Sequence, residues 1–188
     1  LAADDVLDNY GGSNLQDKVR GWVVALNDIS SVQWYGGTSN LTSNNLINTI
    51  EGVAVLTSTG EDPIAKELLG YKNSKAIATA TANTGCSNWS PQITSNTTSG
   101  WYLPSIAQLQ RIYQAETTIT DKLTAASGTA VNAGVYLSST LYQNKDSNYA
   151  PLGINLKEAD KANKTNNYGI ARAQKANSGY YVRAVLTF

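Results

Sequence analysis

The residues of this chain best suited to chemistry are tyrosines, asparagines and one aspartate in its last third. Tyrosine offers a large contact area at a low cost in side-chain entropy, and asparagine offers adaptable hydrogen bonds. These types are typical of surfaces that bind a ligand without changing it covalently. The alternative is that they are ordinary solvated loop residues. The predicted ligand-binding residues are Tyr142, Asn144, Asp146, Asn148, Tyr149, Asn166, Asn167 and Tyr168.

The components of covalent catalysis are missing from the sequence. The chain has no histidine, and a serine or cysteine nucleophile usually needs such a base. No Ser-x-x-Lys motif takes its place, and the carboxylate pairs at 61–62 and 158–160 have neighbours typical of solvated surface. We therefore predict no catalytic residues and no enzymatic activity. Cys86, the single cysteine, is expected to be a small buried apolar residue.

Metal, cofactor and nucleic-acid binding have no support in the sequence. Asp146 and Asp160 could offer oxygen ligands to calcium, but their spacing does not resemble a calcium loop. No glycine-rich phosphate loop is present. The net charge is zero and charged residues make up 15% of the chain, so nothing attracts nucleic acid or an anionic membrane. No apolar run approaches the ~20 residues that span a membrane. We predict no metal and no cofactor.

The stretch 100–113 is expected to position the rest of the chain. Trp101 suits a half-buried strand, and Pro104 ends that strand. Ser105 and Gln108 have the spacing of a capping box, in which each side chain bonds to the other's backbone N–H. Apolar residues then follow at helical intervals and predict a helix packed on the core. We expect Trp101 to lie beneath its first turn.

Other elements follow from periodicity and from turn residues. Further helices are predicted at 61–70, ended by Gly70, at 76–82, and at 117–126, capped by Gly128. Pro151 and Gly153 interrupt one predicted strand and place it at a sheet edge. The predicted strands are 21–26 with partner 32–35, then 135–140, 149–156, 167–172 and 180–188.

Strands, then helices, then strands again indicate an α+β fold with segregated elements. The polar stretch 1–20 is predicted to be an N-terminal leader or assembly segment, and 21–188 a single domain.

Several motifs, taken in order, resemble a known family. Gly-Trp-Tyr-Leu-Pro-Ser at 100–105, Tyr-Leu-Ser-Ser-Thr at 136–140 and Tyr-Val-Arg-Ala-Val at 181–185 are similar to the C-type-lectin-like domains of gut Bacteroidetes surface proteins. They are also similar to the variable proteins of diversity-generating retroelements, which share that fold. The stretch 21–28 resembles the first strand of these domains.

The resemblance implies a C-type-lectin-like fold, with two main helices packed on a twisted antiparallel sheet and a ligand surface in the last third. Two positions depart from the family motif: Leu137 stands where tryptophan is usual, and Gln108 where glutamate is usual. The cysteine pairs and calcium-binding sugar motifs of animal lectins are absent. An enzyme of the formylglycine-generating branch would need paired cysteines, and Cys86 stands alone.

The function expected from these features is a non-enzymatic, surface-exposed ligand-binding domain, an adhesin or receptor-binding domain. Its partner would be a protein or glycan on another cell or host surface, and its location extracellular, on a cell surface or on a phage particle. The alternative is a structural subunit of a fimbria or other extracellular filament that self-assembles through residues 1–20. Low charge, a polar surface and a start at Leu1 that suggests processing favour this alternative.

Overall fold

The chain folds as an α+β protein, as the order of its predicted elements indicated. The computed structural model describes residues 21–34, 53, 55–57, 68–77, 85–93, 98–143, 149–155, 170–172 and 179–188. The segment 1–20 lies outside the described residues, so its predicted role as a leader or assembly segment stays a prediction.

Two sheets form the frame of the described part. The smaller has the order β1-β9-β4, with β1 at Trp22–Val24, β9 at Val185–Thr187 and β4 at Trp101–Tyr102. The larger has the order β2-β8-β5-β6-β7, and β3 also pairs with β5. This sheet is mixed, because β5 runs parallel to both β3 and β8. Its strands are β2 (Ile29–Val32), β3 (Val55–Leu56), β5 (Val135–Gln143), β6 (Tyr149–Asn155), β7 (Ile170–Arg172) and β8 (Tyr180–Val182).

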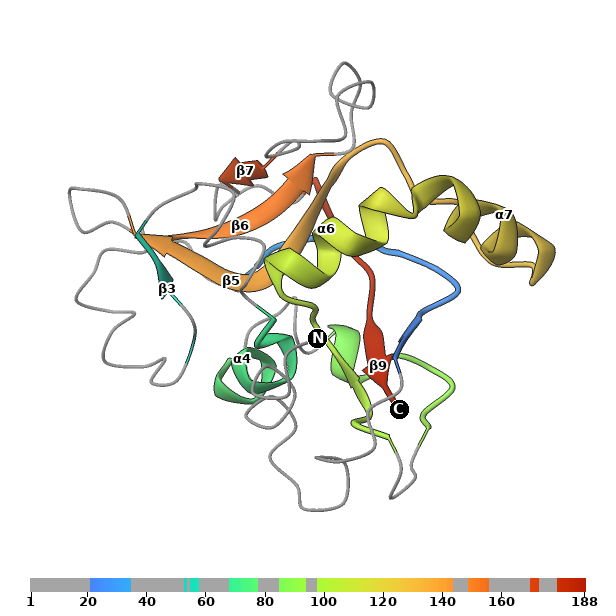
Figure 1. Cartoon of the computed structure of the whole chain (residues 1–188), viewed down its shortest axis with the longest axis horizontal. Helices are drawn as coiled ribbons and strands as arrows, with labels where there is room; N and C mark the ends of the chain where they lie inside the picture. The colour runs from blue at the N-terminus through green and yellow to red at the C-terminus, as the bar shows by residue number, and fades with distance from the viewer. Residues whose placement is uncertain are drawn as a thin grey trace.

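Three labelled helices accompany the sheets: α4 (Gly70–Ala76), α6 (Ile106–Gln114) and α7 (Glu116–Ala125). Figure 1 shows α6 lying across β5 and β6, while α7 continues away from the sheets. Ile106, Leu109 and Tyr113 of α6 are buried, as the helical spacing predicted, and they pack with Tyr136 and Ile154 of the sheet. No helix in the described part of the chain is both long and apolar enough to cross a membrane.

The predicted capping box at the start of α6 is confirmed. The Ser105 hydroxyl accepts from the Gln108 N–H at 3.3 Å, and Gln108 Oε1 accepts from the Ser105 N–H at 2.9 Å. The Gln108 side chain also donates to the Tyr102 hydroxyl at 3.1 Å. Trp101 instead belongs to the core cluster on the other side, where its ring N–H donates to the Pro91 carbonyl. The aromatic residue that contacts the first turn of α6 is therefore Tyr102.

The end of α7 differs in detail from the prediction. Ser127 adopts the left-handed conformation with φ of 61°, and Gly128 donates its N–H to the Leu123 carbonyl at 2.7 Å. This is a Schellman motif with serine at the left-handed position. Gly128 is needed for a different reason, because a Cβ there would lie 2.5 Å from the Leu26 carbonyl oxygen.

Gly70 begins a helix, although the sequence predicted that it ends one. It lies directly against the capping box, where a Cβ would be 2.1 Å from Gln108 Oε1 and 2.6 Å from the Ser105 nitrogen. Most of the predicted helix at 76–82 lies outside the described residues, and Ala76 is the last residue of α4. Glycine is required at position 70 because this position packs directly against the capping box formed by Ser105 and Gln108.

Replacing Gly70 with alanine should lower the free energy of unfolding by about 1–3 kcal/mol, the usual cost of overpacking. The loss should appear even though alanine favours helix over glycine by about 1 kcal/mol. The matched control is Gly85→Ala, whose new Cβ would meet only the flexible Ile29 side chain, at 3.3 Å. Urea denaturation followed by circular dichroism measures both. Equal stability of the two variants would contradict the packing argument.

Two strand assignments are corrected by the register. β2 starts at Ile29 and pairs with β8, so it is not the partner of β1. β6 lies between β5 and β7 and is not an edge strand. Among the described residues, β7 pairs with Leu152 to Ile154, so no described ladder bond to β7 requires an N–H from Pro151.

The last predicted strand, 180–188, is two strands in two sheets. β8 belongs to the larger sheet and β9 to the smaller, and Arg183 and Ala184 lie between them. β5 has buried residues on both faces: Leu137 and Leu141 pack with one core cluster and Tyr136 with the other. Cys86 is buried in the first cluster, as predicted, and burial raises the pKa of its thiol.

Candidate functional site

The predicted ligand-binding residues are only partly within the described residues. Tyr142, in β5, is half-buried and packs against the cluster beneath α6. Tyr149, the first residue of β6, is 8% exposed and belongs to the main core cluster. The expectation that Tyr149 lies on the open surface is wrong, because the β5–β6 pairing turns its ring inward. Asn144, Asp146, Asn148, Asn166, Asn167 and Tyr168 lie outside the described residues.

The two groups of predicted residues attach to opposite ends of the sheet. The first follows Gln143, which pairs with Tyr149 at one end of β6. The second follows Asn155, at the other end of the same strand. β6 has 7 residues, so these ends are about 20 Å apart at ~3.4 Å per residue. The described strands therefore do not bring the two groups to one place. That they form a binding surface stays a prediction.

A buried ion pair joins the two ends of the chain's described part. The carboxylate of Asp28, just before β2, accepts from Nε of Arg183, between β8 and β9. Their side chains are 5% and 2% exposed. Nη2 of Arg183 donates to the carbonyls of Thr129 and Ala130 at 3.0 and 3.2 Å, and to the Thr129 hydroxyl at 3.2 Å. The pair thus also fixes the segment that connects α7 to β5.

Tyr136 and Asn132 complete this polar network. The Tyr136 hydroxyl donates to Asp28 Oδ2 at 2.5 Å and accepts from the Asn132 N–H at 2.8 Å. The Asn132 side chain donates to the same Asp28 oxygen at 2.7 Å. Burial raises the pKa of the Tyr136 phenol, and its hydrogen bond to Asp28 and the charge of that carboxylate raise it further. Ionisation of Tyr136 would place a second negative charge beside Asp28.

Stability should fall at alkaline pH partly because of Tyr136. Its folded-state pKa lies above the unfolded value of about 10, so its contribution is complete below pH ~10 and declines as pH rises toward the folded-state pKa. Tyr136→Phe should be less stable than the native chain by about 1–2 kcal/mol at pH 7. That difference should shrink between pH 10 and 11, as measured by urea denaturation. A difference that is constant with pH would contradict the assignment.

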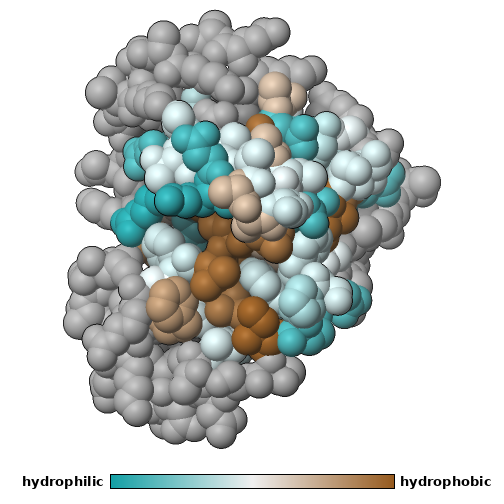
Figure 2. Space-filling view, turned by 90° about the vertical axis from the view of Figure 1, so that its right-hand side faces the viewer, coloured by the Kyte–Doolittle hydropathy of each residue, from teal (hydrophilic) through white to brown (hydrophobic). Residues whose placement is uncertain are grey.

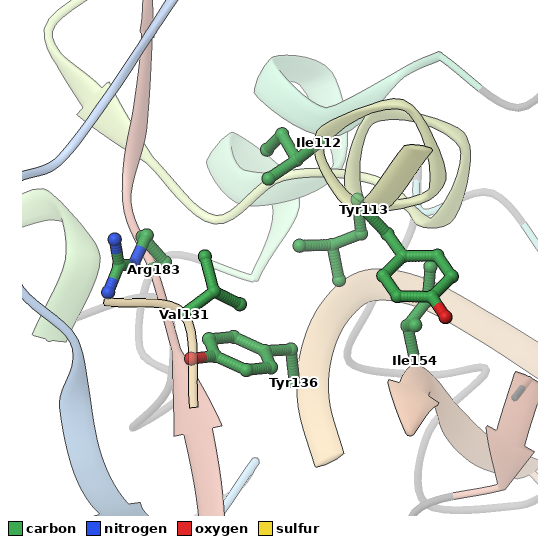
Figure 3. A pocket seen from close by; sticks show the side chains of 7 residues that line it. Ile112, Tyr113, Val131, Tyr136, Ile154 and Arg183 are labelled. Carbon is green, nitrogen blue, oxygen red and sulfur yellow. The ribbon is translucent and has the colours of Figure 1, made fainter. Parts of the chain in front are cut away.

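A small pocket lies beside this network, between α6 and the β5–β6 pair. Its cavity volume is about 20 Å³, which is roughly the room that one water molecule needs. Figure 3 shows the Arg183 guanidinium on one side of it and Tyr113 and Ile154 on the other. The remaining walls are apolar, apart from the Tyr136 ring. Its lining residues are Leu109, Ile112, Tyr113, Val131, Tyr136, Ile154 and Arg183.

The arrangement suits binding and structural support more than proton transfer. Both oxygens of Asp28 already accept hydrogen bonds, from Arg183, Tyr136 and Asn132. A general base needs a lone pair directed at a substrate proton. Within the described residues, no group of three or more His, Cys, Asp or Glu side chains could hold a metal.

Asp28 and Arg183 were not among the predicted site residues. The available signal was an arginine within a strand that is otherwise apolar, at 180–188. A buried arginine nearly always has an acidic partner. Asp28, after the apolar run 21–26, is one of several acidic residues that the sequence offers, and only the fold selects it.

Comparisons with known proteins reveal a structural likeness. No protein-family model matches the chain, and no curated protein matches it. The fold is similar to the crystal structure of a fimbrial protein from Bacteroides ovatus, with 17% sequence identity and a TM-score of 0.53. The match covers 89% of this chain and 36% of that protein, so the chain spans about a third of its length. At this identity the likeness shows a shared fold.

Proposed function

We propose that this chain is a domain of a fimbria or another extracellular filament, with a structural role and no enzymatic activity. The observation that carries the proposal is the fold likeness to a fimbrial protein over 89% of the chain. It favours the structural alternative drawn from the sequence over the ligand-binding function expected first. The proposed location is the cell surface, in keeping with a surface covered by uncharged polar residues.

Exposed apolar side chains provide a candidate assembly surface. Gly21 and Phe188 exchange two backbone hydrogen bonds, of 3.3 and 3.2 Å, and Val23 pairs with Leu186 two residues further on. Val23 and Phe188 therefore project from the same face of the β1–β9 pair. They are 38% and 43% exposed. Figure 2 shows apolar residues gathered in a band on the face in view, flanked by polar ones.

We propose that a second copy of this chain covers Val23 and Phe188, because a filament is built from repeated subunits. Burying a fully exposed side chain of this size contributes about 1.5–3 kcal/mol. Val23 and Phe188 have about two fifths of their surface exposed, so the two together should contribute about 1–2.5 kcal/mol to a dimer. The purified chain should show a mass that rises with concentration in size-exclusion chromatography with light scattering. The double variant Val23→Ser/Phe188→Ser should weaken this association at least about tenfold.

The matched control for this experiment is Val55→Ser. Val55 is 40% exposed but lies on β3, which pairs with β5 of the other sheet. It should leave the concentration dependence unchanged. A chain that stays monomeric at all concentrations, or a double variant that associates like the native chain, would contradict the proposed surface.

The ligand-binding function is a second proposal, within a C-type-lectin-like fold. It is supported by the Asn- and Tyr-rich composition of 142–149 and 166–168 and by the paired ends of β5 and β6 that hold the first segment. The partner would be a protein or glycan on another surface. An array of glycans and surface proteins probed with the intact chain tests it, and the absence of any partner would end it. The likeness to retroelement variable proteins is likewise a proposal.

A further inference from the structure

We propose that the acidic segment 1–16 docks on a cationic surface of its own chain. This cationic surface is formed by Trp22 of β1, Tyr71 and Lys75 of α4, and Arg111 of α6. The segment lies outside the described residues, so the inference rests on its sequence and on the geometry of the surface. It is independent of the filament proposal.

A row of side chains joins the two ends of the cationic surface across the smaller sheet. Thr187 of β9 pairs with Trp22, and its hydroxyl shares a hydrogen bond of 2.8 Å with the Tyr102 hydroxyl. The Tyr71 ring packs edge-on against the Tyr102 ring, with the ring centroids 5.6 Å apart. The outer two, Trp22 and Tyr71, are half-buried, and the two between them are buried. The two half-buried rings therefore belong to one continuous surface.

A cation lies over each of the two outer rings. The guanidinium carbon of Arg111 is 5.6 Å from the centroid of the Trp22 ring, and Nζ of Lys75 is 5.0 Å from that of the Tyr71 ring. Such contacts attract a cation to the face of the ring. Both cationic residues are exposed, and neither has a carboxylate partner among the described residues. Their charges are therefore positioned and open to an anionic partner.

The elements that build the cationic surface carry no carboxylate of their own. α4, α6 and the three strands of the smaller sheet contain Lys72, Lys75 and Arg111 but neither Asp nor Glu. The acidic residues elsewhere in the described part are Asp28, which is paired with Arg183, and two on α7. Figure 1 shows α7 continuing away from the sheets. The two shorter helices thus present three positive charges without a described counter-charge.

The segment 1–16 has the complementary charge. It contains Asp4, Asp5 and Asp8 and neither Lys nor Arg. Because the whole chain has a net charge of zero, the rest of the sequence carries a net charge of +3. Apolar residues between and after these aspartates suit contact with the two half-buried rings. The segment therefore offers both carboxylates for the cations and apolar side chains for the rings.

Covalent connection favours the segment of the same chain over that of a second copy. Residue 16 precedes Trp22 by six positions, and Trp22 is itself part of the cationic surface. At ~3.4 Å per residue, six residues span up to about 20 Å, so the segment reaches the surface from this point. A connection of this length gives an effective concentration of about millimolar. A second copy at micromolar concentration competes poorly with it.

Paramagnetic broadening of nuclear magnetic resonance signals tests the docking in the full chain. A nitroxide is attached to the variant Asn9→Cys in ¹⁵N-labelled protein at ~0.01 M salt, where charges interact over ~30 Å. The chain without this substitution, treated with the same reagent, shows whether the buried Cys86 takes up any label. The nitroxide should broaden the amide signals of Lys75 and Arg111.

Neutral variants of the segment separate docking from mere tethering. Asp4→Asn/Asp5→Asn/Asp8→Asn keeps the length and the connection but removes three charges. The broadening at α4 and α6 should then fall at least about threefold, because three exposed ion pairs are lost. The matched control is Glu61→Gln/Asp62→Asn, which removes two other neighbouring acids and should leave the broadening unchanged. An equal loss in the control, or no loss in the triple variant, would overturn the role of the segment.

Variants of the surface and a mixed sample complete the test. Lys75→Gln/Arg111→Gln should reduce the broadening as much as the triple variant does, while Lys122→Gln, at an exposed position of α7, should not. The reverse result would overturn the surface. In the mixed sample, nitroxide-bearing chains without ¹⁵N are added to ¹⁵N-labelled chains without nitroxide. This mixture should show no broadening at α4 and α6. Broadening as strong as within one chain would assign the surface to a second copy and overturn docking within the chain.

Discussion

Replacing Arg183 with methionine should cost about 3–5 kcal/mol of unfolding free energy, because Asp28 would be left as a buried charge without its counter-ion. For a chain of 188 residues this corresponds to a fall in Tm of about 6–20 °C, at ~2–4 °C per kcal/mol. Methionine keeps most of the apolar length of arginine, so the lost charge dominates the effect. The hydrogen bonds from Nη2 to Thr129 and Ala130 are lost as well. Thermal unfolding followed by circular dichroism measures the change.

The control for this prediction is the double variant Asp28→Asn/Arg183→Met. Removing both charges avoids a lone buried ion, so the double variant should be more stable than Arg183→Met alone. The asparagine introduced at position 28 can still accept a hydrogen bond from the Tyr136 hydroxyl, which bonds to Asp28 in the native chain. If Arg183→Met costs less than about 1 kcal/mol, as exposed pairs do, the ion pair is not buried as described.

Trp34→Ala should also cost about 3–5 kcal/mol, the usual loss for a buried aromatic side chain. Trp34 is 0% exposed and is the largest of the fully buried side chains. Its ring N–H donates to the Ser138 carbonyl in β5 at 2.8 Å, so the variant leaves both a cavity and an unsatisfied buried oxygen. Urea denaturation at neutral pH gives the free energy.

Trp89→Ala provides the comparison for Trp34. The Trp89 ring is partly buried and packs against the same core cluster from the rim, so its removal should cost clearly less. Trp34→Phe should fall between the native chain and Trp34→Ala, because it keeps most of the volume and loses the hydrogen bond. A loss for Trp34→Ala no larger than that for Trp89→Ala would contradict the placement of Trp34.

Local signals predicted the local structure well. Ser105 and Gln108 lie three residues apart, and the capping box they form depends mainly on that spacing. The apolar stripe of α6 and the strand β5 follow in the same way from periods of 3.6 and 2. The buried Cys86 follows from its type. These features are fixed by residues close together in the sequence, so the sequence alone is informative.

The errors concern contacts between distant residues. Gly70 has the form of a helix stop, and only the approach of the capping box from residues 105–108 shows why glycine is required. Pro151 is typical of an edge strand, but β6 is interior because β7 pairs with its residues Leu152 to Ile154. The predicted strand 180–188 is divided at Arg183, whose partner Asp28 lies 155 residues away in the sequence. No local pattern encodes these partners.

The candidate site was harder to predict than the fold for the same reason. Composition alone placed Tyr149 with the other tyrosines and asparagines on a surface, yet pairing with Gln143 directs it into the core. The pocket beside Arg183 is assembled from α6, two strands and the segment before β5, so no single stretch of sequence reveals it. The remaining predicted residues lie outside the described part of the chain and stay predictions.

Immunogold electron microscopy tests the proposed filament role most directly. Antibodies raised against the purified chain would be applied to intact cells that produce it, with cells lacking its gene as the control. The proposal predicts gold particles on filaments that extend from the cell surface, and none on the control cells. Gold confined to the cell interior, or on the cell body with the filaments unlabelled, would contradict it.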